Sequence, residues 1–220
     1  MLSLLALTAI ATWHEPMPET TLSRLQALRD SFVRRAIATG FKCTLPPPKI
    51  LIDKVVSFGG YDRAKNTLTI VEWDQLPKDQ KAFFGMLAGK GATSDLVRQT
   101  FETVIHKYVF VHELGHWTQA CRKWRAWNNH YATEQDANRV STAYWREVDS
   151  TVLTVMSQSF ARFTEGMPSP VPAGNDEKKF FNDNYGKLVP TPGFIWYQAN
   201  MVAIAYKESP APTLKQMLHP

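Results

Sequence analysis

Apolar residues recur at helical spacing in several long stretches of the chain. An amphipathic stripe covers residues 22–36, and Gly40 is expected to end that helix. A second pattern begins at the capping residues 93–95 and continues past residue 110, a third covers residues 133–148, and a fourth covers 195–206. The pattern therefore predicts a mostly helical chain.

Two shorter stretches have the alternation and β-branched residues of strands. These are residues 49–56 and 67–71, with turn chemistry at Gly59 and Gly60 and again at residues 62–66. A small sheet beside many helices predicts the α+β class. We expect one domain over residues 21–220, preceded by an apolar segment at residues 1–20.

The stretch His112-Glu113-Leu114-Gly115-His116 contains the clearest candidate chemistry. On a helix, residues four apart lie on the same face, so His112 and His116 can reach one metal ion. Glu113 lies beside them, where it would take a proton from a zinc-activated water without being a ligand. Gly115 costs stability inside a helix, which indicates that another backbone segment approaches it closely.

Glu134 is the best candidate for a third ligand. It follows His116 after 17 residues, enough for a turn between two helices. Asn138 shares its helix face at i+4 and is expected to accept a hydrogen bond from a ligand histidine. Asp136 is the rival ligand, but it points to a different face. Three protein ligands leave an open position, which is typical of catalytic Zn²⁺ sites.

These motifs resemble those of zincin-type zinc metallopeptidases, in particular the gluzincins. The closest likeness is to ImmA/IrrE-type peptidases, which carry HELGH followed by E-x-x-A-N, matched here by Glu134, Ala137 and Asn138. The resemblance covers residues 61–148 and implies a zincin-like domain that cleaves peptide or protein substrates. It also implies an edge strand beside the metal that pairs with extended substrate, for which 67–71 is the candidate.

Two other functions remain open on the sequence. HExxH specifies an activated water rather than the bond attacked, so a zinc hydrolase of a non-peptide amide or ester is an alternative. A catalytically silent zinc-binding regulatory protein is another. His130, expected in the connection between the two helices, is a candidate oxyanion donor. Tyr185, expected in a loop, and Tyr197 are further candidates without positional support. His106 is expected to be structural because it lies on another side of the helix.

Composition favours a globular domain with a proper core, and the evidence for a nucleic-acid-binding protein is weak. The net charge is +5, but the only tight cluster of basic and aromatic residues, 122–127, reads as the end of the HELGH helix. No nucleic-acid partner is therefore expected. The glycines of 85–91 lack the spacing of a phosphate-binding loop and predict a flexible loop instead.

Cys43 and Cys121 form one disulfide or remain as buried thiols. Residues 2–11 are apolar and resemble a cleavable signal, although no basic residue precedes them. The chain is thus expected to be either cytoplasmic or exported. No apolar run approaches the length of about 18 residues that a membrane span needs. The oligomeric state is not indicated.

Overall fold

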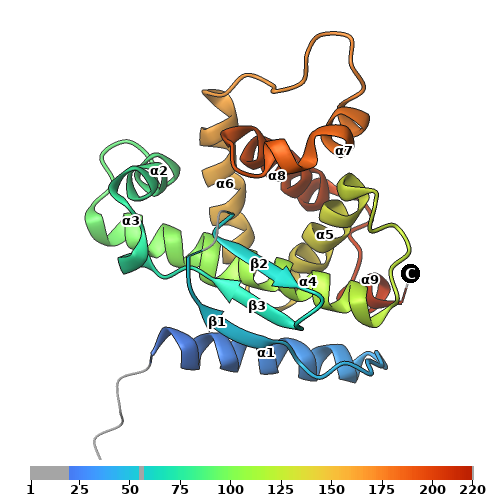
Figure 1. The fold of residues 1–220 in the computed structure, drawn as a ribbon. Helices are drawn as coiled ribbons and strands as arrows, with labels where there is room; N and C mark the ends of the chain where they lie inside the picture. The colour runs from blue at the N-terminus through green and yellow to red at the C-terminus, as the bar shows by residue number, and fades with distance from the viewer. Residues whose placement is uncertain (1–19, 55–56, 220) are drawn as a thin grey trace, which may run out of the picture.

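The structure is a computed structural model that describes residues 20–54 and 57–219. Within these ranges the molecule is mostly helical, with one sheet of three short strands (Figure 1). The α+β class expected from the sequence is confirmed at this level. The apolar segment 1–20 lies outside the described residues except for Thr20.

Helix α1 (Thr21–Ala38) begins and ends where its sequence predicts. The Thr20 side chain accepts a hydrogen bond from the Ser23 backbone N–H at 3.1 Å, which satisfies one of the free donors of the first turn. Gly40 follows the helix with a φ of 90°, a conformation that favours glycine. Phe32 is fully buried on the inner face.

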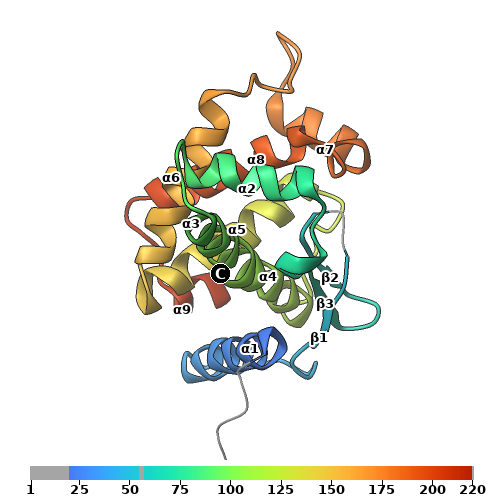
Figure 2. The same ribbon diagram turned by 90° about the vertical axis from the view of Figure 1, so that its left-hand side faces the viewer.

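The sheet consists of β1 (Lys49–Ile52), β2 (Gly59–Asp62) and β3 (Thr67–Ile70), in the order β1-β3-β2. Strands β1 and β3 are parallel, whereas β2 and β3 are antiparallel. Figures 1 and 2 show α1 lying along the β1 side of the sheet.

This topology corrects three expectations. The strand expected at 49–56 ends at Ile52, and residues 55 and 56 lie outside the described residues. Gly59 and Gly60 belong to β2 rather than to a turn. The stretch 67–71 supplies the central strand, so it cannot be the edge strand beside a bound substrate. Strand order depends on long-range pairing, which a local pattern does not encode.

One continuous helical run leads into the HELGH sequence. It consists of α3 (Ser94–Phe101), a π-helical segment η2 (Glu102–Val109) and α4 (Phe110–Cys121). Thr93 caps the run by accepting a hydrogen bond from the Leu96 N–H, so the expected helix start is confirmed. The π-helical geometry was not expected, and such segments often occur near functional sites.

The other helices complete the fold around this run. They are α2 (Lys78–Ala88), α5 (His130–Val148), α6 (Thr151–Glu165), α7 (Glu177–Leu188), α8 (Pro192–Lys207) and α9 (Leu214–Leu218), with a 3₁₀ turn at Trp73–Gln75.

Several expected boundaries differ from these. Helix α5 starts at His130 instead of residue 133, and α4 ends at Cys121, so the cluster 122–127 forms the connection between them. The loops expected at 85–91 and around Tyr185 are helical at 85–88 and 185–186.

Two glycines let neighbouring elements approach α4 and the end of η2. A Cβ atom on Gly115 would lie 3.0 Å from the Ala137 Cα atom of α5, so the close backbone approach expected there is confirmed. A Cβ atom on Gly59 would lie 2.8 Å from Val109 Cγ1 and 3.5 Å from Glu113 Cγ. Glycine at both positions therefore allows the sheet and α5 to pack directly against the HELGH helix.

The hydrophobic core has two parts. The larger part joins α1, the sheet, the long helical run, α5 and α6. The smaller part lies among α5, α7 and α8 and is made of Tyr131, Phe181, Leu188, Phe194, Tyr197 and Met201. Cys43 and Cys121 form a disulfide, which decides between the two states left open by the sequence. Across 20–54 and 57–219, no helix has the length and apolar character needed to cross a bilayer.

We predict that Gly115→Ala lowers the free energy of unfolding by about 1–3 kcal/mol, because the added methyl group overpacks the contact with α5. Gly85→Ala is the matched control, since its Cβ atom meets open space inside α2. It should stabilise the chain by up to about 1 kcal/mol. Urea unfolding followed by circular dichroism measures both, and equal stability of the two variants would contradict this account of the packing.

Candidate metal centre

Three side chains from two helices converge where α4 and α5 touch. His112 and His116 come from successive turns of α4, and Glu134 comes from the second turn of α5. Their candidate ligand atoms all lie within 4.8 Å of one another. His112 Nε2 is 3.1 Å and His116 Nε2 is 3.7 Å from Glu134 Oε2. This group could hold a metal ion.

The cluster is shielded from bulk water. The side chains of His112, His116 and Glu134 are 8, 12 and 7 % exposed. Glu134 also accepts hydrogen bonds from Tyr185 Oη at 2.8 Å and from Gln198 Nε2 at 2.9 Å. A buried carboxylate is costly unless it is paired, so these partners on α7 and α8 stabilise its charge and fix its direction.

Each histidine is oriented by an amide oxygen at its outer nitrogen. His112 Nδ1 lies 3.1 Å from Asn138 Oδ1, and His116 Nδ1 lies 2.9 Å from Gln119 Oε1. The contact between Asn138 and a ligand histidine, expected from the sequence, is therefore present. Amide oxygens only accept, so both histidines donate from Nδ1–H.

The orientation of both amides is fixed by their other partners. Asn138 Nδ2 donates to Gln198 Oε1 at 2.7 Å, and Gln119 Nε2 donates to Thr133 O at 2.8 Å. Reversing either amide would place its oxygen against the oxygen of another acceptor, Gln198 Oε1 for Asn138 and the Thr133 carbonyl for Gln119. The hydrogen-bond network therefore assigns Nδ1–H to His112 and His116, which leaves each neutral ring with a lone pair on Nε2.

Two nitrogen lone pairs and one carboxylate oxygen consequently face a common point. Electron-rich atoms at these separations repel one another unless a proton or a cation lies between them. Burial lowers the pKa of His116, but the charge and hydrogen bond of Glu134, together with Glu113 and Gln119, outweigh burial and raise that pKa to about 9. Burial likewise opposes ionisation of Glu134, yet the two histidines hold its pKa well below the usual range. Protons and metal therefore compete for this cluster.

Glu113 lies beside the cluster without belonging to it. Its residue is 6 % exposed, and the backbone N–H of Tyr61 on β2 lies close enough to its carboxylate to favour the charged form. Burial raises the pKa of Glu113 more than the nearby histidines lower it. A carboxylate with a raised pKa next to a metal centre is suited to accepting and returning a proton.

The structure separates the remaining candidates. Asp136 forms an ion pair with Arg122 and lies outside the cluster. His106 is buried, with Nε2 3.0 Å from the Val71 carbonyl oxygen, as expected of a structural residue. Tyr197 donates to the Glu177 carbonyl and does not line the cleft.

His130 and Tyr185 both face the cleft beside the cluster. Their rings are stacked with centroids 4.0 Å apart. Tyr185 contacts Glu134, a contact for which its sequence position gave no support.

Gln119 and Gln198 also contact the cluster and were not anticipated. Gln119 lies three residues after His116 on the same helix, so helical spacing could have indicated it. Gln198 lies 64 residues after Glu134, and no local signal connects them.

The cluster opens into a cavity of about 520 Å³. Its walls come from β2, α4, the connection between α4 and α5, α7 and α8. A second cavity of about 340 Å³ adjoins it, is lined mainly by apolar side chains, and shares Val109, Phe160 and Phe194 with it. A ligand in the cleft would thus reach both the cluster and an apolar wall.

No protein-family model, curated protein or solved structure matches this chain. Its function is therefore inferred from the geometry of the site itself.

We predict that purified wild-type chain binds close to one metal ion, whereas His116→Ala and Glu134→Ala each lose most of it because two donors hold a metal poorly. His219→Ala, which removes an exposed histidine far from the cluster in sequence, is the control. Elemental analysis after incubation with zinc and desalting measures the content. Full retention by Glu134→Ala would place the third ligand elsewhere.

Gln119→Ala should weaken metal binding by about 10- to 100-fold, because His116 loses the acceptor that orients it. Gln99→Ala removes an exposed glutamine from α3 and should leave the affinity unchanged. Competition with a chromophoric chelator gives the dissociation constants. Equal affinities in the two variants would show that Gln119 does not support the site.

Proposed function

We propose that this chain is a zinc-dependent metallopeptidase in which His112, His116 and Glu134 hold the metal and Glu113 transfers the proton. The supporting observation is the convergence of two Nε2 lone pairs and one carboxylate oxygen, with a fourth group, Glu113, buried next to them at the base of an open cleft.

The donor set fits zinc. For metal–ligand bonds of about 2.0–2.1 Å in tetrahedral geometry, ligand atoms lie roughly 3.3 Å apart. The separations of 3.1 and 3.7 Å from Glu134 Oε2 to His112 and His116 bracket that value. Two imidazoles and one carboxylate leave a coordination position open. When bound, zinc would lower the pKa of water towards about 7 and polarise a substrate carbonyl.

Glu113 is assigned the acid–base role. Its carboxylate accepts a proton from the attacking water and passes it to the departing amine, so a single group acts first as base and then as acid. Burial keeps the basicity of Glu113 higher than that of an exposed glutamate, and the nearby Tyr61 N–H offsets part of this effect. Tyr185 and Gln198 hold Glu134, so that carboxylate remains a ligand rather than a second base.

Strand β2 is the candidate surface for a peptide backbone. It lies at the edge of the sheet, contributes Gly59, Gly60 and Tyr61 to the cleft, and carries the N–H that reaches Glu113. An extended peptide can add to such an edge through backbone hydrogen bonds, which provide affinity with little sequence preference. We therefore propose β2, instead of residues 67–71, as the edge strand that pairs with substrate.

The order of elements supports the gluzincin resemblance. A small sheet precedes the HELGH helix, and a later helix carries the glutamate ligand and an asparagine that contacts His112. We therefore propose a zincin-like arrangement related to that of ImmA/IrrE-type peptidases.

We predict that Glu113→Gln retains zinc but loses peptide hydrolysis by at least about 10²-fold, because the amide cannot accept the proton. Glu165→Gln, at an exposed position at the end of α6, is the control and should retain activity. Zinc content and cleavage of a mixed peptide library by mass spectrometry are measured on the same preparations.

Wild-type activity in purified Glu113→Gln would exclude this role for Glu113. Hydrolysis of esters or other amides, without cleavage of any peptide, would instead favour the non-peptide alternative. Zinc binding without turnover of any substrate would favour a catalytically silent, zinc-binding regulatory protein.

A further inference from the structure

Among the described residues that line the cleft, one side chain is permanently cationic, and the proposed hydrolytic mechanism does not use it. Arg63 lies in the turn that follows β2. It is two residues beyond Tyr61, whose N–H contacts Glu113. At about 3.3 Å per residue along a strand, this places the Arg63 backbone roughly 7 Å from that contact. The distance corresponds to one or two residues of an extended substrate.

The guanidinium group of Arg63 contacts Trp127, which also lines the cleft. The Arg63 Cζ atom lies 4.5 Å from the centre of the Trp127 ring, and Trp127 belongs to the connection between α4 and α5. Stacking restricts the guanidinium plane but leaves the N–H groups at its edge available as donors. The cation is therefore positioned at the cleft and remains able to bind an anion.

No carboxylate of the described residues forms an ion pair with Arg63. The adjacent Asp62 is engaged within its own turn. Its Oδ1 atom accepts the backbone N–H groups of Ala64 and Lys65 at 2.9 and 3.1 Å, and its Oδ2 atom lies 3.3 Å from Lys65 Nζ. Arg63 thus has donors without an anionic partner.

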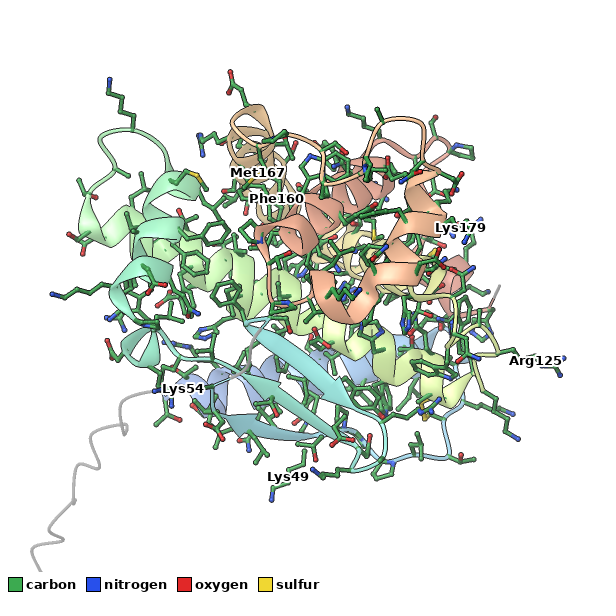
Figure 3. All side chains as sticks on the ribbon, turned by 45° about the horizontal axis from the view of Figure 1, so that its top comes forward. Lys49, Lys54, Arg125, Phe160, Met167 and Lys179 are labelled. Carbon is green, nitrogen blue, oxygen red and sulfur yellow. A yellow bond between two sulfur atoms is a disulfide. The ribbon has the colours of Figure 1, made fainter. Side chains whose placement is uncertain are left out.

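The rest of the cleft has no competing exposed charge. Among the lining residues that the structure describes, the carboxylates are Glu113 and Glu134, both buried at the metal centre. Other cations are directed elsewhere: Lys49, Arg125 and Lys179 extend outward from the surface and do not line the cleft (Figure 3). Arg63 is therefore the described lining residue outside the cluster that can distinguish ligands by a permanent charge.

We propose that the substrate carries a carboxylate that binds Arg63 close to the cleaved bond. Either an acidic side chain or the free C-terminus of a short peptide supplies this group, because both present the same two oxygens to a guanidinium fork. The inference rests on the proposed function and adds a substrate class to it: acidic peptides, selected at the open end of β2.

Binding is measured first, separately from cleavage. A set of short peptides is made in which one glutamate, the only charged side chain, occupies a different position in each. These peptides are titrated by calorimetry into the Glu113→Gln chain after incubation with zinc. Each peptide has a glutamine analogue, and each is made with a free and an amidated C-terminus. An exposed ion pair is worth up to about 1 kcal/mol, so we expect the best glutamate or free-acid peptide to bind about fivefold more tightly than its neutral analogue.

Three further substitutions in the same background test the residue. Arg63→Gln should abolish the preference, and Arg63→Glu should reverse it in favour of peptides with lysine. Lys65→Gln is the matched control, because it removes the same charge from the same turn outside the cleft lining. It should keep the preference. If only amidation of the C-terminus removes the tighter binding, the C-terminal carboxylate is the group that binds Arg63. If only replacement of glutamate by glutamine removes it, the side-chain carboxylate is that group.

The two proposals fail in different ways. Equal binding of acidic and neutral peptides, binding of neither, or the same loss of preference in Lys65→Gln as in Arg63→Gln would overturn the role of Arg63. An Arg63-dependent preference in peptides that wild-type chain never cleaves would support that role and count against the hydrolytic function. Cleavage without any preference for acidic peptides would leave the hydrolytic function in place and exclude the acidic substrate class.

Discussion

The site depends on how closely two backbones approach the HELGH helix. Gly115 lets α5 reach α4, and Gly59 lets β2 reach the start of α4. A larger residue at Gly115 would move α5 and with it Glu134, which supplies the third donor of the cluster. A larger residue at Gly59 would move β2 away from Val109 and Glu113. Both contacts are steric, so small displacements would change the geometry of the whole centre.

A buried hydrogen-bond network then connects these elements to the C-terminal helices. Gln198 on α8 contacts both Glu134 and Asn138, while Tyr185 on α7 contacts the other oxygen of Glu134. Buried polar groups are costly when unpaired, and in this network each partner satisfies another. Helices α7 and α8 thus position the cluster as well as covering it. The same network assigns the protonated nitrogen of each histidine, and so explains why two lone pairs face Glu134.

The cleft outside the metal centre is asymmetric. Its lining is shared in part with an apolar cavity, whereas Arg63 and Trp127 line only the cleft that contains the cluster. The proposed zinc-activated water would attack many carbonyl compounds, so the selectivity of the proposed enzyme would come from these walls. In the proposed function, the edge strand β2 would provide general affinity for an extended backbone, and Arg63 would add a preference for negatively charged peptides.

The sequence by itself determined the features that follow from local periodicity. Helical spacing places His112 and His116 on one face, and the same rule places Glu134 and Asn138 together. The helix cap at Thr93 and the close contact at Gly115 could also be predicted from neighbouring residues. Tertiary structure alone decided the rest: the central position of 67–71, the strand at Gly59, the Cys43–Cys121 pairing and the arrival of Gln198 and Tyr185 at Glu134. These contacts join residues far apart in the chain, and their partners are selected by packing of the whole fold rather than by the repeat of any one helix or strand.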